Sequence, residues 1–343
     1  MGASKANLGL AATQRYGLDN SPMTGSINLI DRDQFWHRAM RWAAPQMASQ
    51  ASSGVNTALG CWNGQWREPF ARPSPPVEEC SMKTVIFVHG MFQNPVSWQK
   101  WTSYFSEKGY DCVTPAWPLH AGNPVDLRES PPEGLGDLHL HEVIEAIEAQ
   151  VRRYDLPIMI GHSVGGLITQ ILLSRGLLSS GVAINSVAPN AMIDLDWGFI
   201  KNSAIIANPL KGNAPVLMDE KTFHGTFANT LSEAEAAAEF EATATHDSRN
   251  VLRDCMGEDG RIDLDAPHAP LLLIGGEEDQ IIPAHLTEKN FKAYTDAASL
   301  TEFLPFAGRS HYICSEPGWQ DVAEAAYQFI ERNSAATSVG AII

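Results

Sequence analysis

Beyond residue 83, hydrophobic positions follow two spacings that alternate along the chain. Short apolar runs rich in branched residues are typical of buried strands, and apolar residues three or four positions apart are typical of helices. The spacing predicts strands at 84–88, 110–114, 157–160, 181–187, 270–274 and 300–304, and helices at 94–108, 138–154, 164–175, 284–294 and 319–332. This alternation predicts an α/β fold that is doubly wound, with a mostly parallel sheet covered by helices on both faces.

The alternation stops between residues 190 and 266. This stretch has helical segments and no convincing strand: one helical segment lies near 219–231, and an Ala/Glu-rich one opens with a Ser232-x-x-Glu235 capping box. We therefore expect residues 190–266 to form a helical cap insertion. In the loop after the second predicted strand, three prolines are expected to prevent regular structure: Pro115, Pro118 and Pro124.

The core of the α/β fold is predicted to comprise residues 81–189 and 267–343, which leaves residues 1–80 as an N-terminal extension or arm. The periodicity of this segment is poor and residues 71–76 are Pro-rich, yet it holds four of the nine tryptophans of the chain. Residues 33–44 could form an amphipathic helix. We expect the arm to pack on the core or on a second subunit, so a homodimer is one alternative.

The central candidate for chemistry is Gly161-His162-Ser163-Val164-Gly165, between a predicted strand and a predicted helix. A G-x-S-x-G motif in that context forms a nucleophile elbow, a sharp turn that strains the serine backbone and presents its hydroxyl at the C-terminal edge of the sheet. Ser163 is therefore the candidate nucleophile. Side chains at Gly161 and Gly165 would collide with the neighbouring strand and helix.

A serine hydroxyl needs a base to accept its proton and a third group to orient that base. With an elbow of this kind, the acid and then the histidine follow the serine along the chain. Asp279 is the candidate acid, because it lies in the turn after a buried strand; its neighbours Glu277 and Glu278 are interpreted as solvated rivals. His311 is the candidate base, because it lies on the loop after the last predicted strand.

The segment His89-Gly90-Met91-Phe92 directly follows the first predicted strand. The backbone amides of Met91 and Val164 are the candidate oxyanion hole, in which two N–H groups stabilise a developing negative charge. Val164 begins a helix, where unpaired amides and the helix dipole favour an anion. His89 and His162 flank these motifs and are expected to position the backbone through hydrogen bonds.

Taken together, four motifs resemble those of the α/β-hydrolase superfamily, in the branch with a helical cap. They are His89-Gly90-Met91-Phe92, Gly161-His162-Ser163-Val164-Gly165, Gly276-Glu277-Glu278-Asp279 and Gly308-Arg309-Ser310-His311. The resemblance covers roughly residues 83–332. Epoxide hydrolases and haloalkane dehalogenases of this fold use an aspartate at the elbow, whereas this chain has Ser163.

The resemblance implies an enzyme that needs no cofactor and no metal. Our leading hypothesis is a serine hydrolase that cleaves a small to medium, mostly apolar carboxylic ester or lactone through an acyl-enzyme intermediate. A C–C bond hydrolase, a thioesterase, an amidase, a perhydrolase and a non-hydrolytic lyase such as a cyanohydrin lyase remain alternatives, because one fold hosts many reactions. A ligand receptor that has kept the fold is a weaker alternative.

Composition limits the partners of the protein. The net charge is −16, of which residues 1–80 contribute +1 and residues 81–343 contribute −17. We therefore expect a small-molecule substrate and no nucleic acid. No apolar run approaches the ~20 residues of a membrane span, so we expect no stable membrane insertion. Five cysteines without CxxC spacing predict reduced thiols, no zinc site and a cytoplasmic location.

Overall fold

The computed structural model describes residues 82–192 and 212–339, all of which belong to the unit Pro76–Ile343. The predicted N-terminal arm and its helix at 33–44 lie outside the described residues, as do residues 193–211 of the insertion.

Six strands form one sheet in the order β2-β1-β3-β4-β5-β6, and every neighbouring pair is parallel. Each strand overlaps its predicted range, and the predicted parallel sheet is confirmed. Because the C-terminal ends of parallel strands meet at one edge, the loops after β1, β3, β5 and β6 can share one site. The bounds are β1 Thr84–Val88, β2 Asp111–Val113, β3 Ile158–His162, β4 Ser180–Ile184, β5 Leu271–Gly276 and β6 Thr301–Phe306.

Side chains along each inner strand alternate between two hydrophobic clusters, one on each face of the sheet. In β1, Ile86 and Val88 belong to the first cluster, whereas Val85 and Phe87 belong to the second. The first cluster also contains side chains of α4 and α5, and the second contains side chains of α2 and α11. Burial on both faces explains the near-continuous apolar sequence of these strands. These helices are α2 (Gln99–Glu107), α4 (Leu140–Val151), α5 (Val164–Ser174) and α11 (Trp319–Val339).

Local signals set several helix boundaries. The Asn94 side chain accepts the Val96 amide at 3.1 Å and begins a 3₁₀ turn, Pro95–Trp98, that leads into α2. Gly109 follows this helix with φ +88°, a value that a glycine adopts without strain. Helix α10 (Ala284–Ala293) packs against β5 and β6. The predicted helices at 94–108 and 284–294 are thus present with nearly the predicted bounds.

The loop after β2 contains a short helix where we expected irregular structure. Helix α3 (Pro124–Glu129) begins at one of the three prolines of this loop. A proline is tolerated in the first turn of a helix, because its missing N–H would have no intrahelical partner there. The Asn123 side chain caps the helix by accepting the Val125 amide at 2.8 Å. The expectation of an irregular loop is therefore wrong for residues 124–129.

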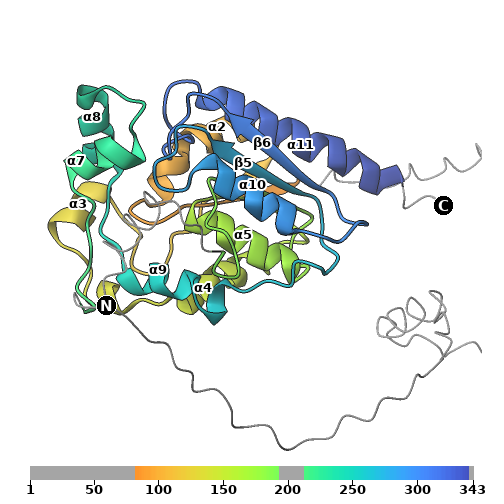
Figure 1. The fold of residues 1–343 in the computed structure, drawn as a ribbon, viewed down its shortest axis with the longest axis horizontal. Helices are drawn as coiled ribbons and strands as arrows, with labels where there is room; N and C mark the ends of the chain where they lie inside the picture. The colour runs from red at the N-terminus through yellow and green to blue at the C-terminus, as the bar shows by residue number, and fades with distance from the viewer. Residues whose placement is uncertain (1–81, 193–211, 340–343) are drawn as a thin grey trace, which may run out of the picture. The chain divides into compact units, whose positions relative to one another are not determined.

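The described part of the insertion is helical, as predicted. It contains α7 (Glu220–Thr222), a π-helical turn (Phe223–Phe227), α8 (Glu233–Thr243) and α9 (Arg249–Cys255). The predicted capping box opens α8, since the Ser232 amide donates to Glu235 Oε2 at 2.9 Å and the Glu235 amide donates to Ser232 Oγ at 3.3 Å. Figure 1 shows α7 and α8 beside α3, and α9 beside α4. The described residues also include two further short 3₁₀ turns, Leu135–Asp137 in the core and Glu258–Gly260 after α9.

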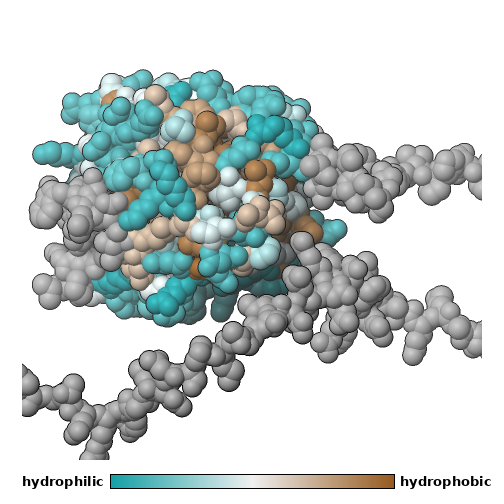
Figure 2. Space-filling model, turned by 45° about the vertical axis from the view of Figure 1, so that its right-hand side comes forward, coloured by the Kyte–Doolittle hydropathy of each residue, from teal (hydrophilic) through white to brown (hydrophobic). Residues whose placement is uncertain are grey.

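The surface of the molecule is mostly hydrophilic on the face drawn in Figure 2, where hydrophobic residues occur in small groups between polar ones. Large exposed hydrophobic side chains are scattered over separate elements, such as Leu156 before β3 and Met256 after α9. Single exposures of this kind are normal for a globular protein. None of the helices within the described ranges has the length and apolar character needed to cross a membrane.

Candidate active site

Ser163 lies in the sharp turn between β3 and α5. Its backbone has φ +56° and ψ −119°, a conformation that residues other than glycine seldom adopt. The Ser163 amide donates to the Ile184 carbonyl of β4 at 2.9 Å, and the Ser163 carbonyl accepts the Val187 amide at 3.2 Å. Hydrogen bonds to the neighbouring strand and its loop therefore hold the strained turn in place, as a nucleophile elbow requires.

Glycines allow three chain segments to pass close to one another at this turn. A Cβ atom on Gly161 would lie 2.1 Å from the carbonyl oxygen of Gly165, and one on Gly165 would lie 2.2 Å from that of Val88. These are the collisions with helix and strand that the sequence predicts. A Cβ atom on Gly90 would lie 2.7 Å from the Ser163 Cβ atom. The loop after β1 therefore runs directly beside Ser163.

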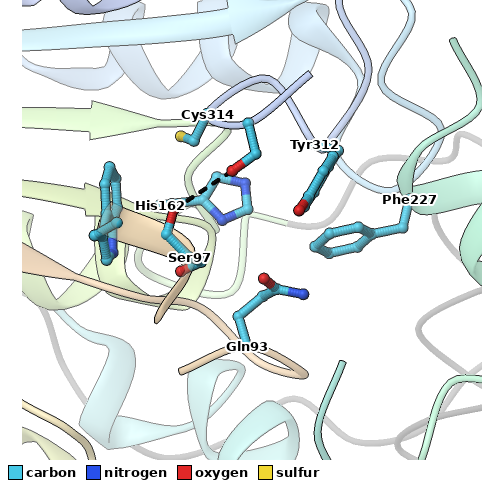
Figure 3. Close-up of a pocket in the computed structure, with 8 residues that line it drawn as sticks. Gln93, Ser97, His162, Phe227, Tyr312 and Cys314 are labelled. Carbon is cyan, nitrogen blue, oxygen red and sulfur yellow. Dashed lines mark hydrogen bonds between the residues drawn. The ribbon is translucent and has the colours of Figure 1, made fainter. Parts of the chain in front are cut away.

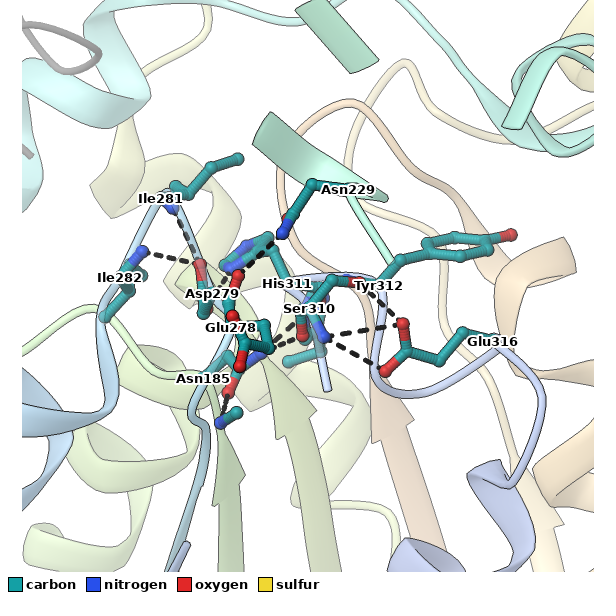
Figure 4. A network of polar contacts seen from close by, with 12 residues as sticks. Asn185, Asn229, Glu278, Asp279, Ile281, Ile282, Ser310, His311, Tyr312 and Glu316 are labelled. Carbon is teal, nitrogen blue, oxygen red and sulfur yellow. Dashed lines mark hydrogen bonds and ion pairs between the residues drawn. The ribbon is translucent and has the colours of Figure 1, made fainter. Parts of the chain in front are cut away.

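Asp279 and His311 lie side by side at the same edge of the sheet. His311 Nδ1 donates a hydrogen bond of 2.7 Å to Asp279 Oδ2, and both side chains are buried. The other carboxylate oxygen accepts the amides of Ile281 at 2.7 Å and Ile282 at 2.8 Å, which fix its orientation (Figure 4). An imidazole that donates through Nδ1 presents Nε2 as an acceptor. The structure thus brings together the predicted base and the predicted orienting acid.

The two rival carboxylates, Glu277 and Glu278, are exposed, as expected. The main chain of Glu278 nevertheless has a structural role. Its amide donates to the Arg309 carbonyl at 2.9 Å, and its carbonyl accepts the Asn229 side chain at 2.9 Å. The turn that carries Asp279 is therefore tied both to the loop after β6 and to the insertion.

A buried asparagine links the same two loops. Asn185 Oδ1 accepts the Gly276 amide at 2.7 Å, and Asn185 Nδ2 donates to the Ser310 carbonyl at 3.0 Å (Figure 4). The buried Glu316 carboxylate accepts the Ser310 amide at 3.1 Å, the Ser310 hydroxyl at 2.7 Å and the Thr230 hydroxyl. These contacts hold the backbone on which His311 sits. The sequence analysis missed Asn185 and Glu316, because no local motif marks them.

Ser163 and His311 are both buried, with 8% and 1% of their surface exposed. Among the described residues, no hydrogen bond joins these two side chains. His162 connects their backbones, because its Nε2 donates to the His311 carbonyl at 2.8 Å. The Phe227 ring of the insertion lies 5.0 Å from the His311 ring, centre to centre. An aromatic side chain therefore covers the candidate base from the side of the insertion.

Two histidines position the backbone near Ser163, as predicted. Burial and the neighbouring His311 lower the pKa of His162 well below its usual value. Burial, followed by the neighbouring His120, lowers the pKa of His89 to about 3. His89 Nδ1 donates to the Gly90 carbonyl at 2.9 Å, and His89 Nε2 accepts the Trp117 amide at 3.3 Å. Both imidazole rings are therefore neutral, and each holds nearby backbone groups in place through hydrogen bonds.

The loop that carries Met91 is held by the insertion. Phe92 has φ +63°, which is an uncommon value for an aromatic residue. Its amide donates to Asp247 Oδ2 at 2.9 Å, and its carbonyl accepts the Thr245 amide at 3.0 Å. The Phe92 amide already donates to Asp247 and cannot also bind an oxyanion. The Met91 amide is therefore the candidate oxyanion donor in this loop.

Asp247 is fully buried between the insertion and the core. Its backbone pairs with Val216 in an isolated antiparallel bridge, and its carboxylate lies 3.4 Å from His120 Nε2. Burial opposes protonation of His120, yet the charge and hydrogen bonding of Asp247 raise its pKa overall. Asp247 is a third residue that the sequence analysis missed, because its partner Phe92 is 155 positions away.

Within residues 82–192 and 212–339, no cluster of three or more His, Cys, Asp or Glu side chains could hold a metal ion. Three cysteines fall in these ranges, Cys112, Cys255 and Cys314, and all are free thiols. Cys61 and Cys80 lie outside the described residues.

Comparison with protein families matches residues 85–325 to the model described as the alpha/beta hydrolase family. A search of proteins with curated descriptions returns no match to this sequence. Solved structures share the fold at low sequence identity. A monoacylglycerol lipase from Paleococcus ferrophilus has a TM-score of 0.54 and 17% identity over 72% of this chain and 93% of its own.

Two plant proteins have similar folds. A methylesterase from Arabidopsis has a TM-score of 0.55 and 13% identity, and the match covers 73% of this chain and 99% of that one. Tomato methylketone synthase I, solved with 2-tridecanone, has a TM-score of 0.56 and 13% identity, over 74% of this chain and 99% of its own. At these identities the likeness concerns the fold alone.

Proposed function

The chain belongs to the alpha/beta hydrolase family, and from this premise we propose that it is a serine hydrolase acting on a small to medium, mostly apolar carboxylic ester or lactone. The observation that carries the proposal is the 2.7 Å hydrogen bond from His311 Nδ1 to Asp279 Oδ2, at the sheet edge that also presents Ser163 in a strained turn. A base, its orienting acid and a strained serine are the three parts of a nucleophilic triad.

In the proposed reaction, Ser163 Oγ attacks the substrate carbonyl while His311 Nε2 accepts its proton. The Asp279 carboxylate keeps the imidazole in the required tautomer and stabilises its charged form. The amides of Met91 and Val164 donate to the oxyanion of the tetrahedral intermediate. The alcohol leaves with the proton from His311, and the same base then activates the water that releases the acid from the acyl-enzyme.

The surroundings of the site favour an uncharged, apolar substrate. The Phe227 ring lies beside His311 and stacks on Phe223 with 5.0 Å between ring centres. Met91 and Trp117 belong to the same hydrophobic cluster as these two phenylalanines. The net charge of −16 also opposes the approach of strongly anionic substrates.

In this proposal the insertion, residues 190–266, acts as a cap over the strand ends. Two contacts of its described part support that role. Phe227 packs against His311, and Asp247 binds the amide of Phe92 in the loop beside Ser163. Substrate size is then governed by side chains from the insertion and the core together.

Labelling with a fluorophosphonate, followed by intact-mass measurement and peptide mapping, tests the nucleophile. We expect a single adduct on the peptide that contains Ser163, no adduct in Ser163→Ala, and an unchanged adduct in Ser174→Ala. Ser174 is a matched control, because it lies at the far end of the same helix and its hydroxyl donates to the Ile171 carbonyl. An adduct that persists in Ser163→Ala contradicts the assignment.

Product analysis in heavy-oxygen water tests the reaction type. A hydrolase incorporates the solvent oxygen into the released acid, since water attacks the acyl carbon. A lyase that uses His311 as a general base forms its product without that oxygen. Unlabelled product from an active preparation therefore rules out the hydrolase.

A further inference from the structure

A small cavity lies directly beside the candidate active site. Its volume is about 10 Å³, which is room for one group the size of a water or a hydroxyl. Figure 3 shows the Gln93 amide pointing toward the space between His162 and Phe227, with the Tyr312 ring on the adjacent wall. Trp98 and Cys314 also line the cavity.

The walls of this cavity come from segments that carry the proposed catalytic groups. Gln93 lies two residues after Met91, His162 precedes Ser163, and Tyr312 follows His311. Phe227 packs on the rings of both His162 and His311. The cavity therefore lies beside the chain segments that carry the proposed nucleophile and base.

The orientation of the Gln93 amide is determined by its hydrogen bonds. Gln93 Nε2 donates to the Phe92 carbonyl at 3.1 Å and to Thr243 Oγ1 at 3.3 Å. Thr243 Oγ1 uses its own proton on the Glu239 carbonyl at 2.8 Å, so it accepts from Gln93. A flipped amide would direct an oxygen at the Phe92 carbonyl. Gln93 Oε1 is thus the free end of this amide.

Gln93 Oε1 is a buried acceptor that receives no hydrogen bond from a protein group of the described chain. Gln93 is 2% exposed, so bulk water does not satisfy this oxygen. A buried acceptor that receives no hydrogen bond is unfavourable, and a donor placed in the cavity would relieve this cost. Trp98, on the cavity wall, has an indole N–H that likewise has no protein acceptor.

A hydroxyl group fits these walls best. It donates one proton to Gln93 Oε1 and keeps its lone pairs for a second donor. An ammonium group would need a counter-ion, and none of the eight lining residues is acidic. A carboxylate would face the oxygen of Gln93. A methyl group would leave Gln93 Oε1 unsatisfied.

We propose that this cavity is a subsite for a hydroxyl group of the substrate, with Gln93 as the specificity-determining residue. The inference rests on the proposed function, since it names the substrate class as a hydroxylated ester or lactone. A site built to bind a hydroxyl discriminates strongly against the analogue without it, because the analogue leaves the buried polar groups unpaired.

Matched pairs of esters test the subsite. Nitrophenyl butyrate is compared with its 2-, 3- and 4-hydroxybutyrate analogues, and propyl butyrate is compared with glycerol monobutyrate, so that the hydroxyl lies on the acyl or on the alcohol part. We expect kcat/KM to be at least about tenfold higher for one hydroxylated ester than for its unsubstituted partner. Equal kcat/KM within every pair overturns the proposal.

Variants then assign the preference to Gln93. Gln93→Leu is expected to lower the ratio of kcat/KM within the preferred pair to about one. Both kcat/KM values in a ratio are measured on the same preparation, so a smaller fraction of folded protein lowers both equally and leaves the ratio unchanged. Thr243→Val removes the acceptor that orients the amide and is expected to reduce the ratio less. Gln150→Leu, on α4 and bonded to Arg153, is the matched control and is expected to keep the original ratio. An undiminished ratio in Gln93→Leu contradicts the role of Gln93.

A binding measurement separates this inference from the proposed function. The Ser163→Ala protein is titrated with the same ester pairs by calorimetry, which needs no turnover. Tighter binding of a hydroxylated ester, lost in Ser163→Ala/Gln93→Leu, supports the subsite even if the wild type cleaves no ester. Equal affinities for both members of every pair overturn the subsite even if the wild type is an active esterase.

Discussion

The Asp247 carboxylate accepts the Phe92 amide at 2.9 Å, and this bond helps to connect the insertion to the loop beside Ser163. The Thr245 amide binds the carbonyl of the same residue at 3.0 Å, so the Phe92 peptide groups are held from both sides. Phe92 has a positive φ, which costs free energy unless its surroundings enforce it. The position of the neighbouring Met91 amide therefore depends on Asp247.

Replacing Asp247 should impair the chemical step. In Asp247→Ala the buried Phe92 amide loses its acceptor, and we expect kcat to fall about tenfold or more with KM little changed, since loss of an oxyanion donor typically costs 100- to 1,000-fold. Asp247→Asn keeps an acceptor oxygen and should lose less. Steady-state kinetics on a cleaved ester measures both variants.

The matched control for this prediction is Asp254→Ala. Asp254 also links the insertion to the core, because its Oδ2 accepts the Leu140 amide at 3.1 Å and bonds His139 Nδ1 at 2.8 Å. Both of these partners lie at the start of α4 and not in the loop after β1. Thermal unfolding should show a loss of stability in both variants. A comparable fall in kcat in both would mean that Asp247 acts through stability alone.

Replacing Asp279 by asparagine should abolish most activity without unfolding the protein. An asparagine amide can accept a hydrogen bond from His311 Nδ1, but it lacks the negative charge that stabilises the imidazolium. We therefore expect kcat to fall about 10,000-fold. Glu278→Gln, one residue earlier and exposed, should keep wild-type activity. If Asp279→Asn keeps its activity, a carboxylate other than Asp279 must orient the catalytic histidine.

Much of the fold could be predicted because its signals are local. The apolar run Ile158–Ile160 predicts a buried strand by composition alone, and the Ser232-x-x-Glu235 motif marks the start of α8 with two reciprocal hydrogen bonds. Helix α3 was not predicted, because a proline was interpreted as a breaker although Asn123 provides a cap that makes Pro124 a starting residue. The distinction depends on one neighbouring side chain.

The residues of the candidate site also fall into two groups, those that a local motif marks and those that it does not. Ser163, Asp279 and His311 follow motifs with a fixed place relative to strands, so their proximity follows from the order of the sheet. Asn185 and Asp247 have no such motif. Each is defined by a partner 91 to 155 positions away, and only the packed fold shows which buried polar side chain meets which backbone amide.

Replacing Asn185 should loosen both loops of the proposed base and acid. Asn185→Ala leaves the Gly276 amide and the Ser310 carbonyl without their buried partners, which we expect to cost about 2–4 kcal/mol of stability. Asn185→Asp restores the acceptor for Gly276 but not the donor to Ser310, so it should recover part of the loss. Urea unfolding measures the stability of the three proteins, which should decrease from the wild type to Asn185→Asp to Asn185→Ala. Equal stability of the three would contradict this prediction.

The pH dependence of stability should reflect the neutral, buried His89. Its folded pKa is about 3, well below the value of about 6.5 in an unfolded chain. Between these two values the unfolded state binds a proton that the folded state does not. The stabilisation is therefore fully present above pH 6.5 and is lost as the pH falls toward 3, by up to about 1.4 kcal/mol per pH unit. His162, whose pKa is also lowered, acts in the same direction.

Urea unfolding between about pH 7.5 and 4.5 measures this dependence. We expect the free energy of unfolding of the wild type to fall more steeply with acid than that of His89→Gln, in which a neutral amide can donate to the Gly90 carbonyl and accept from Trp117. The difference between the two slopes of unfolding free energy against pH should approach the value for one proton taken up on unfolding, because the variant lacks one titrating group. Above pH 6.5 the two curves should run parallel, which provides an internal control. Parallel curves over the whole range would show that His89 is protonated as easily in the folded protein as in the unfolded chain.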